Sequence, residues 1–274
     1  MRGMIVVMET FSDYILGEEN FGAKLEITYY LAKKENIYFN KAVIFKTELA
    51  RLFMKYNKLE LNENLVLTAC LLCSSKKKEN YKNLEEVKNY AKESAEYLSE
   101  LGFNKRFCKI CEEVNRYSKS QPRERESDIL ELVDHFGGLL LDRPERIGFQ
   151  ADEALVLLKY RNLKDEYNRY LEIFEEFVYM LEEIHIEETT KEKPIEKLVK
   201  MHNETEDLTE FIKKIINNYE PLVDKILNKK YKEVKKEMFG ETSNFNKIPL
   251  FTEETTKKII ENIEKRKKAL EDVS

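Results

Sequence analysis

The chain has 274 residues, 36% of them charged, and a formal net charge of -5 at pH 7. This near balance of charges argues against general binding of nucleic acids or of anionic membranes. Eight glycines and five prolines are too few for a β-rich fold with many tight turns, so we expect an all-α protein. No apolar run approaches the roughly 18 residues of a membrane span, and the opening residues lack a signal-peptide cleavage site. We therefore expect no membrane contact and a cytoplasmic location, where thiols stay reduced.

Hydrophobic spacing predicts a series of helices before Pro122, although residues 1–38 are hard to assign. Asn62 is placed to cap the helix that follows it, and Gly102 is a good residue to end the next one. Pro122 breaks the chain. The helices expected in this part lie near 20–34, 40–57, 61–73, 83–101 and 104–118.

The segment 126–142 predicts an amphipathic helix with a broad apolar face. On a helical wheel Asp128 and Glu131 lie on its polar face, and Asp134 lies on the border between the two faces. A proline ends this helix, and the next one begins after Gln150.

A heptad seam is predicted over 163–184, where seven apolar residues alternate at spacings of four and three. Such a stripe must be covered by later helices of the same chain, by a second copy or by a partner helix. Aromatic side chains hold four of the seven positions, which favours cover within an irregular helical bundle. The seam residues are Leu163, Tyr167, Tyr170, Phe174, Phe177, Leu181 and Ile184.

The rest of the chain predicts a linker and three further helices. The polar stretch EETTKEKPI, 187–195, has the composition of a linker. Pro221 and the segment from Gly240 onward indicate breaks between helices. The helices are expected near 205–219, 222–239 and 252–271.

Most common catalytic motifs are missing from the sequence. The three histidines are far apart, none belongs to an H-x-x-x-H pair, and His135 belongs on a polar helix face. Neither a G-x-x-x-x-G-K-[ST] phosphate loop nor a G-x-S-x-G nucleophile turn is present. We therefore expect no cofactor and no resident metal from these patterns.

Two C-x-x-C pairs, Cys70 with Cys73 and Cys108 with Cys111, leave three interpretations open. Four thiolates can hold zinc or an iron–sulfur cluster. The 34 residues between the pairs exceed the usual zinc-ribbon spacing, and each pair lies in an apolar helical pattern. We therefore favour buried core thiols over a structural metal site, and both over redox chemistry.

The segment ILELVDHFGGLLLDRPERIGFQADEAL, 129–155, resembles the end of the HD-GYP family of metal-dependent phosphohydrolases, which reads approximately ILxVADxFDALTSDRPYRxxxxxxEAL. Upstream, LTACLLCSSKK is similar to the family's AALLHDIGK, and SAEYLSELGF is similar to its GAEILxxLGL. The resemblance covers roughly residues 40–160. The matching residues of its last segment are Ile129, Leu130, Val133, Asp134, Phe136, Leu139, Asp142, Arg143, Pro144, Arg146, Glu153, Ala154 and Leu155.

The resemblance implies an HD-domain-like helical bundle, in which histidines and aspartates hold two or three metal ions. A metal-bound hydroxide then attacks a phosphodiester, typically cyclic di-guanylate. In this sequence only Asp134 matches a metal ligand, and one carboxylate cannot assemble a binuclear centre. The other motif positions fall on or near Phe45, Cys73-Ser74, Tyr90, Val114-Asn115 and Ser120-Gln121-Pro122.

We therefore expect an uncertain segment 1–38, a degenerate HD-GYP-like domain at 39–160 and a helical extension at 161–274. The functional hypothesis is a catalytically inactive binding or scaffold module of bacterial signalling. A vestigial pocket with Asp134, Arg143 and Arg146 would suit a nucleotide, and the 163–184 seam would suit a protein partner or a homodimer. The alternatives are a phosphohydrolase rebuilt around residues such as Asp134 and Cys73, and a structural metal protein that uses the four cysteines.

Overall fold

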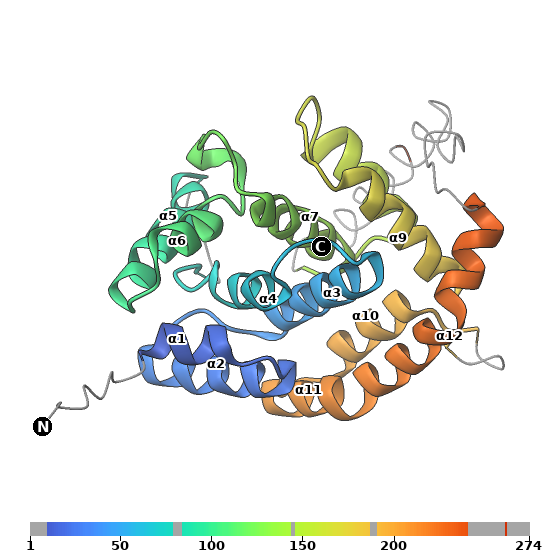
Figure 1. The fold of residues 1–274 in the computed structure, drawn as a ribbon, viewed down its shortest axis with the longest axis horizontal. Helices are drawn as coiled ribbons and strands as arrows, with labels where there is room; N and C mark the ends of the chain where they lie inside the picture. The colour runs from blue at the N-terminus through green and yellow to red at the C-terminus, as the bar shows by residue number, and fades with distance from the viewer. Residues whose placement is uncertain (1–9, 79–83, 144–145, 187–190, 241–260, 262–274) are drawn as a thin grey trace, which may run out of the picture. The chain divides into compact units, whose positions relative to one another are not determined.

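The computed structural model describes residues 10–78, 84–143, 146–186, 191–240 and 261. Within these residues every regular element is a helix, which confirms the all-α class (Figure 1). None of the helices in the described ranges is long and apolar enough to cross a membrane. The helix expected at 252–271 falls outside the described residues apart from Glu261.

The chain divides into two compact units, and neither is a continuous stretch of sequence. The first unit holds the chain up to Arg51 together with 60–131, and the second holds 52–59 together with 132–274. The boundaries near 38 and 160 that the sequence suggests stay predictions. The helices that build the first unit, wholly or in part, are α1 (Phe11–Gly17), α2 (Phe21–Glu35), α3 (Lys41–Asn57), α4 (Glu63–Leu72), α5 (Leu84–Glu100), α6 (Lys105–Glu112), the 3-10 turn η1 (Arg116–Ser118) and α7 (Arg125–Leu140).

Local capping explains most helix ends in the first unit. The side chain of Asn62 accepts the backbone N–H of Leu65 at 3.0 Å, so the predicted cap of α4 is confirmed. Gly102 follows α5 with φ +90°, a conformation that glycine adopts without strain. The helix expected over 104–118 is shorter than predicted, because the side chain of Asn115 caps η1 and starts a new turn there.

Helix α1 was not predicted, although its N-terminus carries a capping box. The side chain of Thr10 accepts the N–H of Asp13 at 3.2 Å, and the Asp13 carboxylate accepts the N–H of Thr10 at 3.2 Å. At the other end, the fully buried Lys24 of α2 donates to the carbonyl of Ile15 and to the hydroxyl of Thr68, the latter at 2.7 Å. One amine thus closes the end of α1 and ties α2 to α4.

Burial lowers the pKa of Lys24 to about 8, and Glu18 opposes this shift only in part. An unfolded lysine keeps a pKa near 10.5, so between about pH 8 and 10.5 the unfolded state binds a proton that the folded state does not. The contribution of Lys24 to the free energy of unfolding should therefore rise with pH over this window, by up to about 3 kcal/mol. Urea titrations at several pH values should show that the free energy of unfolding of the wild type, minus that of Lys24→Met, rises by this amount. The same difference taken with the exposed Lys34→Met change on the same helix should stay constant, and a constant difference for Lys24→Met would contradict the assignment.

The second unit is also helical. Besides the end of α3 and most of α7, it contains α8 (Ala151–Leu157), the π-helical turn η2 (Leu158–Asn162), α9 (Leu171–Glu183), α10 (Pro194–Glu204), α11 (Leu208–Lys214), the π-helical turn η3 (Ile215–Tyr219) and α12 (Glu220–Phe239). Helix α9 packs against α8, α10 and α12 (Figure 1). Its core is aromatic: the ring of Phe174 lies 5.1 Å from that of Phe53, 5.3 Å from that of Phe136 and 6.0 Å from that of Phe177.

The prediction of one continuous seam over 163–184 is wrong. Helix α9 begins only at Leu171, and Tyr167 is 77% exposed. Turn chemistry overrides the heptad spacing here, because Asp165 adopts a left-handed backbone and the side chain of Asn168 accepts the N–H of Tyr170. From residue 170 to 184 the predicted seam positions are buried within this single chain. They therefore offer no exposed stripe to a second copy.

The linker expected at 187–195 is wrong at its C-terminal end, and 187–190 lie outside the described residues. Helix α10 begins at Pro194, and Pro194 and Ile195 are buried. Glu196 accepts the backbone N–H of Lys193, so proline and glutamate together form a helix start. Pro221 likewise lies in the first turn of α12, which continues directly from η3. At Pro194 the missing N–H is not needed, because the residue lies in a first turn. The break expected at Pro221 is wrong, since α11, η3 and α12 follow one another without a gap.

Candidate functional site

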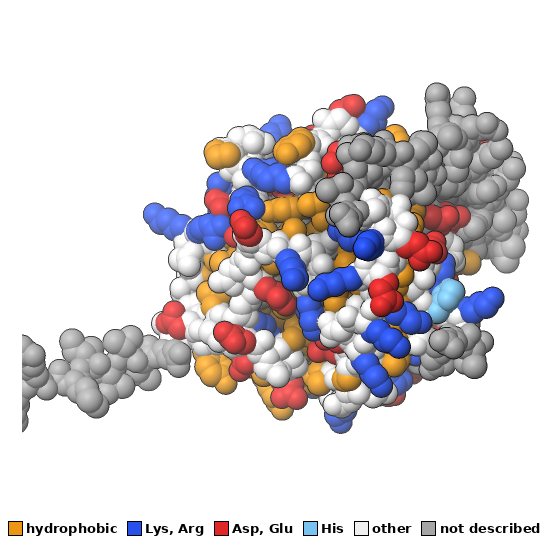
Figure 2. Space-filling view, turned by 45° about the vertical axis from the view of Figure 1, so that its right-hand side comes forward, with side chains coloured by type: hydrophobic (Ala, Val, Ile, Leu, Met, Phe, Trp, Pro, Cys, Tyr) orange, Lys and Arg blue, Asp and Glu red, His pale blue; other side chains and the backbone are white. Residues whose placement is uncertain are grey.

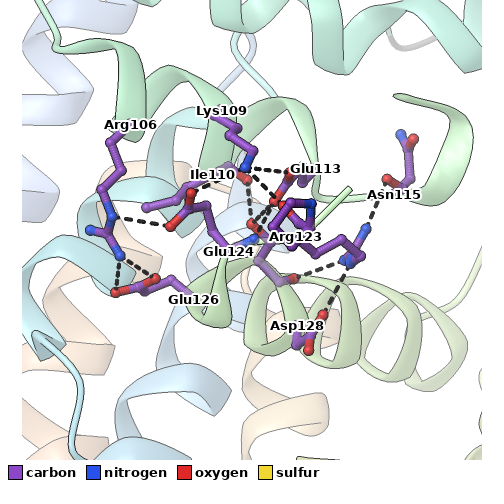
Figure 3. Close-up of polar contacts among 11 residues, drawn as sticks. Arg106, Lys109, Ile110, Glu113, Asn115, Arg123, Glu124, Glu126 and Asp128 are labelled. Atoms are coloured by element: carbon purple, nitrogen blue, oxygen red, sulfur yellow. Dashed lines mark hydrogen bonds and ion pairs between the residues drawn. The ribbon is translucent and has the colours of Figure 1, made fainter. Parts of the chain in front are cut away.

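Buried charged residues gather in the first unit where α6, η1 and the start of α7 meet (Figure 3). Three carboxylates, those of Glu113, Asp128 and Glu131, are at most 1% exposed. The wheel places Asp128 and Glu131 on the polar face of the helix, and in the structure this part of the polar face is buried. Carboxylates at such depth require charged or hydrogen-bonding partners, because an isolated buried charge is very unfavourable.

Arginines supply these partners. The Nε of Arg123 donates to Asp128 at 3.0 Å, and Arg123 is itself buried. Arg116 donates two hydrogen bonds to the carboxylate of Glu131, at 2.7 and 2.8 Å. The Nη2 atom of Arg123 lies 3.7 Å from the same carboxylate. Two-bond arginine–carboxylate contacts are both strong and directional. We call Arg116, Arg123, Asp128 and Glu131 the arginine–carboxylate network.

Glu113 fixes the chain that leads into this network. One of its oxygens accepts the backbone N–H of Glu124 and the hydroxyl of Ser127, both at 2.8 Å. Its other oxygen lies 3.7 Å from the amine of Lys109, which also donates to the carbonyl of Pro122 at 2.8 Å (Figure 3). These contacts hold the segment between α6 and α7 in one conformation.

A more exposed pair completes the cluster. Arg106 donates to both oxygens of Glu126, at 2.9 and 2.7 Å, and to Glu124 at 3.1 Å (Figure 3). Lys109 also donates to Glu124 at 3.2 Å, and this contact connects Arg106 and its acidic partners to Lys109 and Glu113. Because Arg106 is half-exposed, this outer part contributes less to stability than the buried pairs.

The chemistry available to this cluster follows from the pairing. A carboxylate that already binds a guanidinium must give up that contact before it can hold a metal ion. Within the described ranges, no group of three or more histidine, cysteine, aspartate or glutamate side chains has an arrangement that could hold one. The cluster is suited to fixing the shape of a loop rather than to activating water.

The positions that resemble the family's ligand sites are occupied by packed side chains in the first unit. Phe45, Cys73, Tyr90 and Val114 are each at most 6% exposed. The carbonyl of Asn115, beside Val114, lies 3.5 Å from a guanidinium nitrogen of Arg123. Aromatic and aliphatic groups at these positions contribute to the core and supply no metal ligand, Cys73 excepted.

The three site residues predicted from the sequence all lie in the second unit. Asp134 is half-buried on α7, and Arg143 is exposed. Arg146 is occupied: its guanidinium donates to the carbonyls of Gly138, Leu139 and Leu141, the last two at 2.9 and 3.3 Å. Its side chain thus caps the C-terminus of α7.

Other described residues that follow α7 also bond to the backbone around them. Arg143 and Arg146 exchange backbone hydrogen bonds of 2.8 and 3.0 Å. The N–H of Gly148 donates to Asp142 at 2.7 Å, and a side chain at Gly148 would come within 2.0 Å of the Leu140 carbonyl oxygen. Asp142, Arg146 and Gly148 therefore each make a contact with the backbone at or after the end of α7.

The four cysteines come together in the first unit, where α4 packs against α6. Cys70, Cys73 and Cys111 are buried, and Cys108 is partly exposed. Burial raises the pKa of the Cys111 thiol well above its usual value, and the neighbouring thiols of Cys73, Cys108 and Cys70 raise it further. A raised pKa favours the protonated thiol, which is neither a good nucleophile nor a good metal ligand.

Cys73→Ala should lower the free energy of unfolding by about 1–2 kcal/mol, as a small core truncation does. Cys108→Ala should cost less, because its side chain is partly exposed. Denaturant unfolding measures both. Mass spectrometry of the native protein and elemental analysis should find no zinc or iron to release. A metal that survives dialysis in stoichiometric amount and is lost from Cys73→Ala would instead support the structural metal protein.

Comparison with family models, with curated proteins and with solved structures gives no match. The HD-GYP resemblance therefore rests on the sequence motifs alone.

Proposed function

We propose that this chain is a catalytically inactive, HD-GYP-like helical module that acts as a binding or scaffold protein in bacterial signalling. The observation that carries the proposal is the arginine–carboxylate network. A hydrolytic centre of this family needs carboxylates and neutral imidazoles that are open to metal ions. Here Asp128 and Glu131, two acids buried in the first unit, are each bound to an arginine.

The network favours a binding or scaffold role for a second reason. It keeps the segment 113–124 in a fixed shape with buried ion pairs, which bring specificity of conformation in some proteins. A fixed surface loses little conformational entropy when a partner binds. The proposed nucleotide pocket contains Asp134, Arg143 and Arg146, and the guanidinium of Arg146 also bonds to carbonyls at the end of α7.

The phosphohydrolase alternative is tested directly. We expect no hydrolysis of cyclic di-guanylate, bis-p-nitrophenyl phosphate or nucleoside phosphates when manganese, iron or nickel is added, because the matching ligand positions hold no histidine. Product is quantified by chromatography over a range of protein concentrations. The matched variant is Asp134→Ala, which removes the one ligand position that is kept. Turnover that scales with wild-type protein and disappears in Asp134→Ala would replace the proposal with a rebuilt metal site.

A further inference from the structure

A groove of about 880 Å³ lies in the second unit between the end of α3 and the last turns of α12. Every residue that lines it belongs to 52–59 or to 132–274, so it is formed within one unit. Its most prominent feature is charge. Among the described residues, five lysines and no acidic residue line the groove: Lys55, Lys58, Lys232, Lys235 and Lys236.

Two of these lysines are neutralised from outside the groove. Lys55 pairs with Asp224 at 2.6 Å, and Lys235 pairs with Glu176 at 3.4 Å. The other three make no ion pair with any described residue. On the face that Figure 2 shows, basic and acidic side chains are interspersed. The described lining of the groove, whose charged residues are all lysines, thus differs from that mixed surface.

Two tyrosines, Tyr56 and Tyr231, also line the groove. The rings of Tyr56 and Tyr231 lie 5.6 Å apart. The hydroxyl of Tyr231 donates to the side chain of Asn57 at 3.3 Å, and that of Tyr56 donates to Asp224 at 3.1 Å. These contacts connect α3 to α12. They therefore hold the lysines at the end of α3 and the lysines of α12 around one groove.

The position of a single lysine in this groove can be explained by the helix that carries it. Lys55 and Lys236 lie in the last turns of α3 and α12, where a cation favours the helix dipole. It does not account for lysines from two helices that line one groove, since like charges repel each other there. A ligand with several negative charges would turn this repulsion into attraction.

We propose that the groove binds a small anion that carries a chain of two or more phosphate groups. Lysine ammonium groups suit phosphate as mobile point charges. The volume lies in the range of roughly 300–1,000 Å³ that is typical of small-molecule sites. The chain's net charge of -5 opposes the general attraction that a long polyanion such as nucleic acid requires. The groove is distinct from the arginine–carboxylate network, so the proposal goes beyond the proposed function and does not depend on it.

Isothermal titration calorimetry with inorganic triphosphate, at low ionic strength, tests the proposal. We expect saturable binding with one site, which weakens as salt is added. Lys232→Glu with Lys236→Glu should weaken it at least about tenfold, because two attractions become repulsions. The matched control is Lys164→Glu with Lys213→Glu, which makes the same change in net charge at exposed positions of the second unit outside the groove.

Each outcome decides the question. Binding that is lost in the groove variant and kept in the control, with unchanged circular dichroism of both, supports the proposal. Absence of saturable binding in the wild type, or equal weakening in both variants, overturns it. A single-stranded oligonucleotide that binds more tightly than triphosphate, through the same lysines, also overturns it, because the groove would then be part of a nucleic-acid surface. Hydrolysis measured in the separate activity assay would bear on the proposed function only.

Discussion

Arg123→Met should lower the free energy of unfolding by about 3–5 kcal/mol, the range seen when one partner of a buried ion pair is removed. Asp128 is 1% exposed, and Arg123 is its arginine partner at 3.0 Å. Methionine keeps much of the length of the arginine stem, so the loss reports the charge rather than a cavity. Urea unfolding followed by circular dichroism measures the effect.

The double variant Arg123→Met with Asp128→Leu is the decisive control. It removes both charges, so no uncompensated carboxylate remains, and hydrophobic replacements of buried pairs are often neutral or stabilising. The double variant should therefore be more stable than Arg123→Met alone. A double variant as unstable as the single one, or less stable, would show that Arg123 acts through packing or through its contact with Glu131. Exposed Glu93→Ala on α5 should change the free energy of unfolding by no more than about 0.5 kcal/mol.

The fold class and most of the first unit could be predicted because their signals are local. Asn62 caps α4 through its own side chain, and Gly102 ends α5 with a positive φ. The predicted linker at 187–195 overlaps α10 only at Pro194 and Ile195, and the sequence predicts no helix over 196–204. The start of α10 at Pro194 shows that a proline followed two residues later by glutamate is a helix-start signal.

The candidate site could be predicted only in part, because its partners come from separate segments. Asp128 and Glu131 lie on the polar face of an amphipathic helix, and nothing local indicates that this face is covered. Their burial depends on Arg116 and Arg123, which reach them from η1 and from the segment before α7. The local sequence R-E-R-E-S-D at 123–128 reads as a solvated charge run. Only tertiary structure buries Arg123 and Asp128 of this run as an ion pair.

Substitutions at two positions of the predicted seam should differ sharply in their effect on stability. The substitution at the buried position should have the largest effect on folding that we expect in the second unit. Phe174 is fully buried among three phenylalanine rings, whereas Tyr167 is 77% exposed before the start of α9. Phe174→Ala should cost about 3–5 kcal/mol through the cavity that it leaves. Phe174→Glu should unfold the second unit, because a carboxylate without a partner would replace an aromatic side chain in the core.

Tyr167→Glu should leave both stability and association unchanged, since its side chain already faces solvent. Circular dichroism and sedimentation velocity of the wild type and of both glutamate variants separate folding from assembly. If α9 is covered by its own chain, Phe174→Glu loses helical signal at any protein concentration. A dimeric wild type that Phe174→Glu converts into a well-folded monomer would mean that a second copy covers this helix in solution. A dimer dissociated by Tyr167→Glu would place the contact at the exposed turn 164–167, and the buried face of α9 would remain internal.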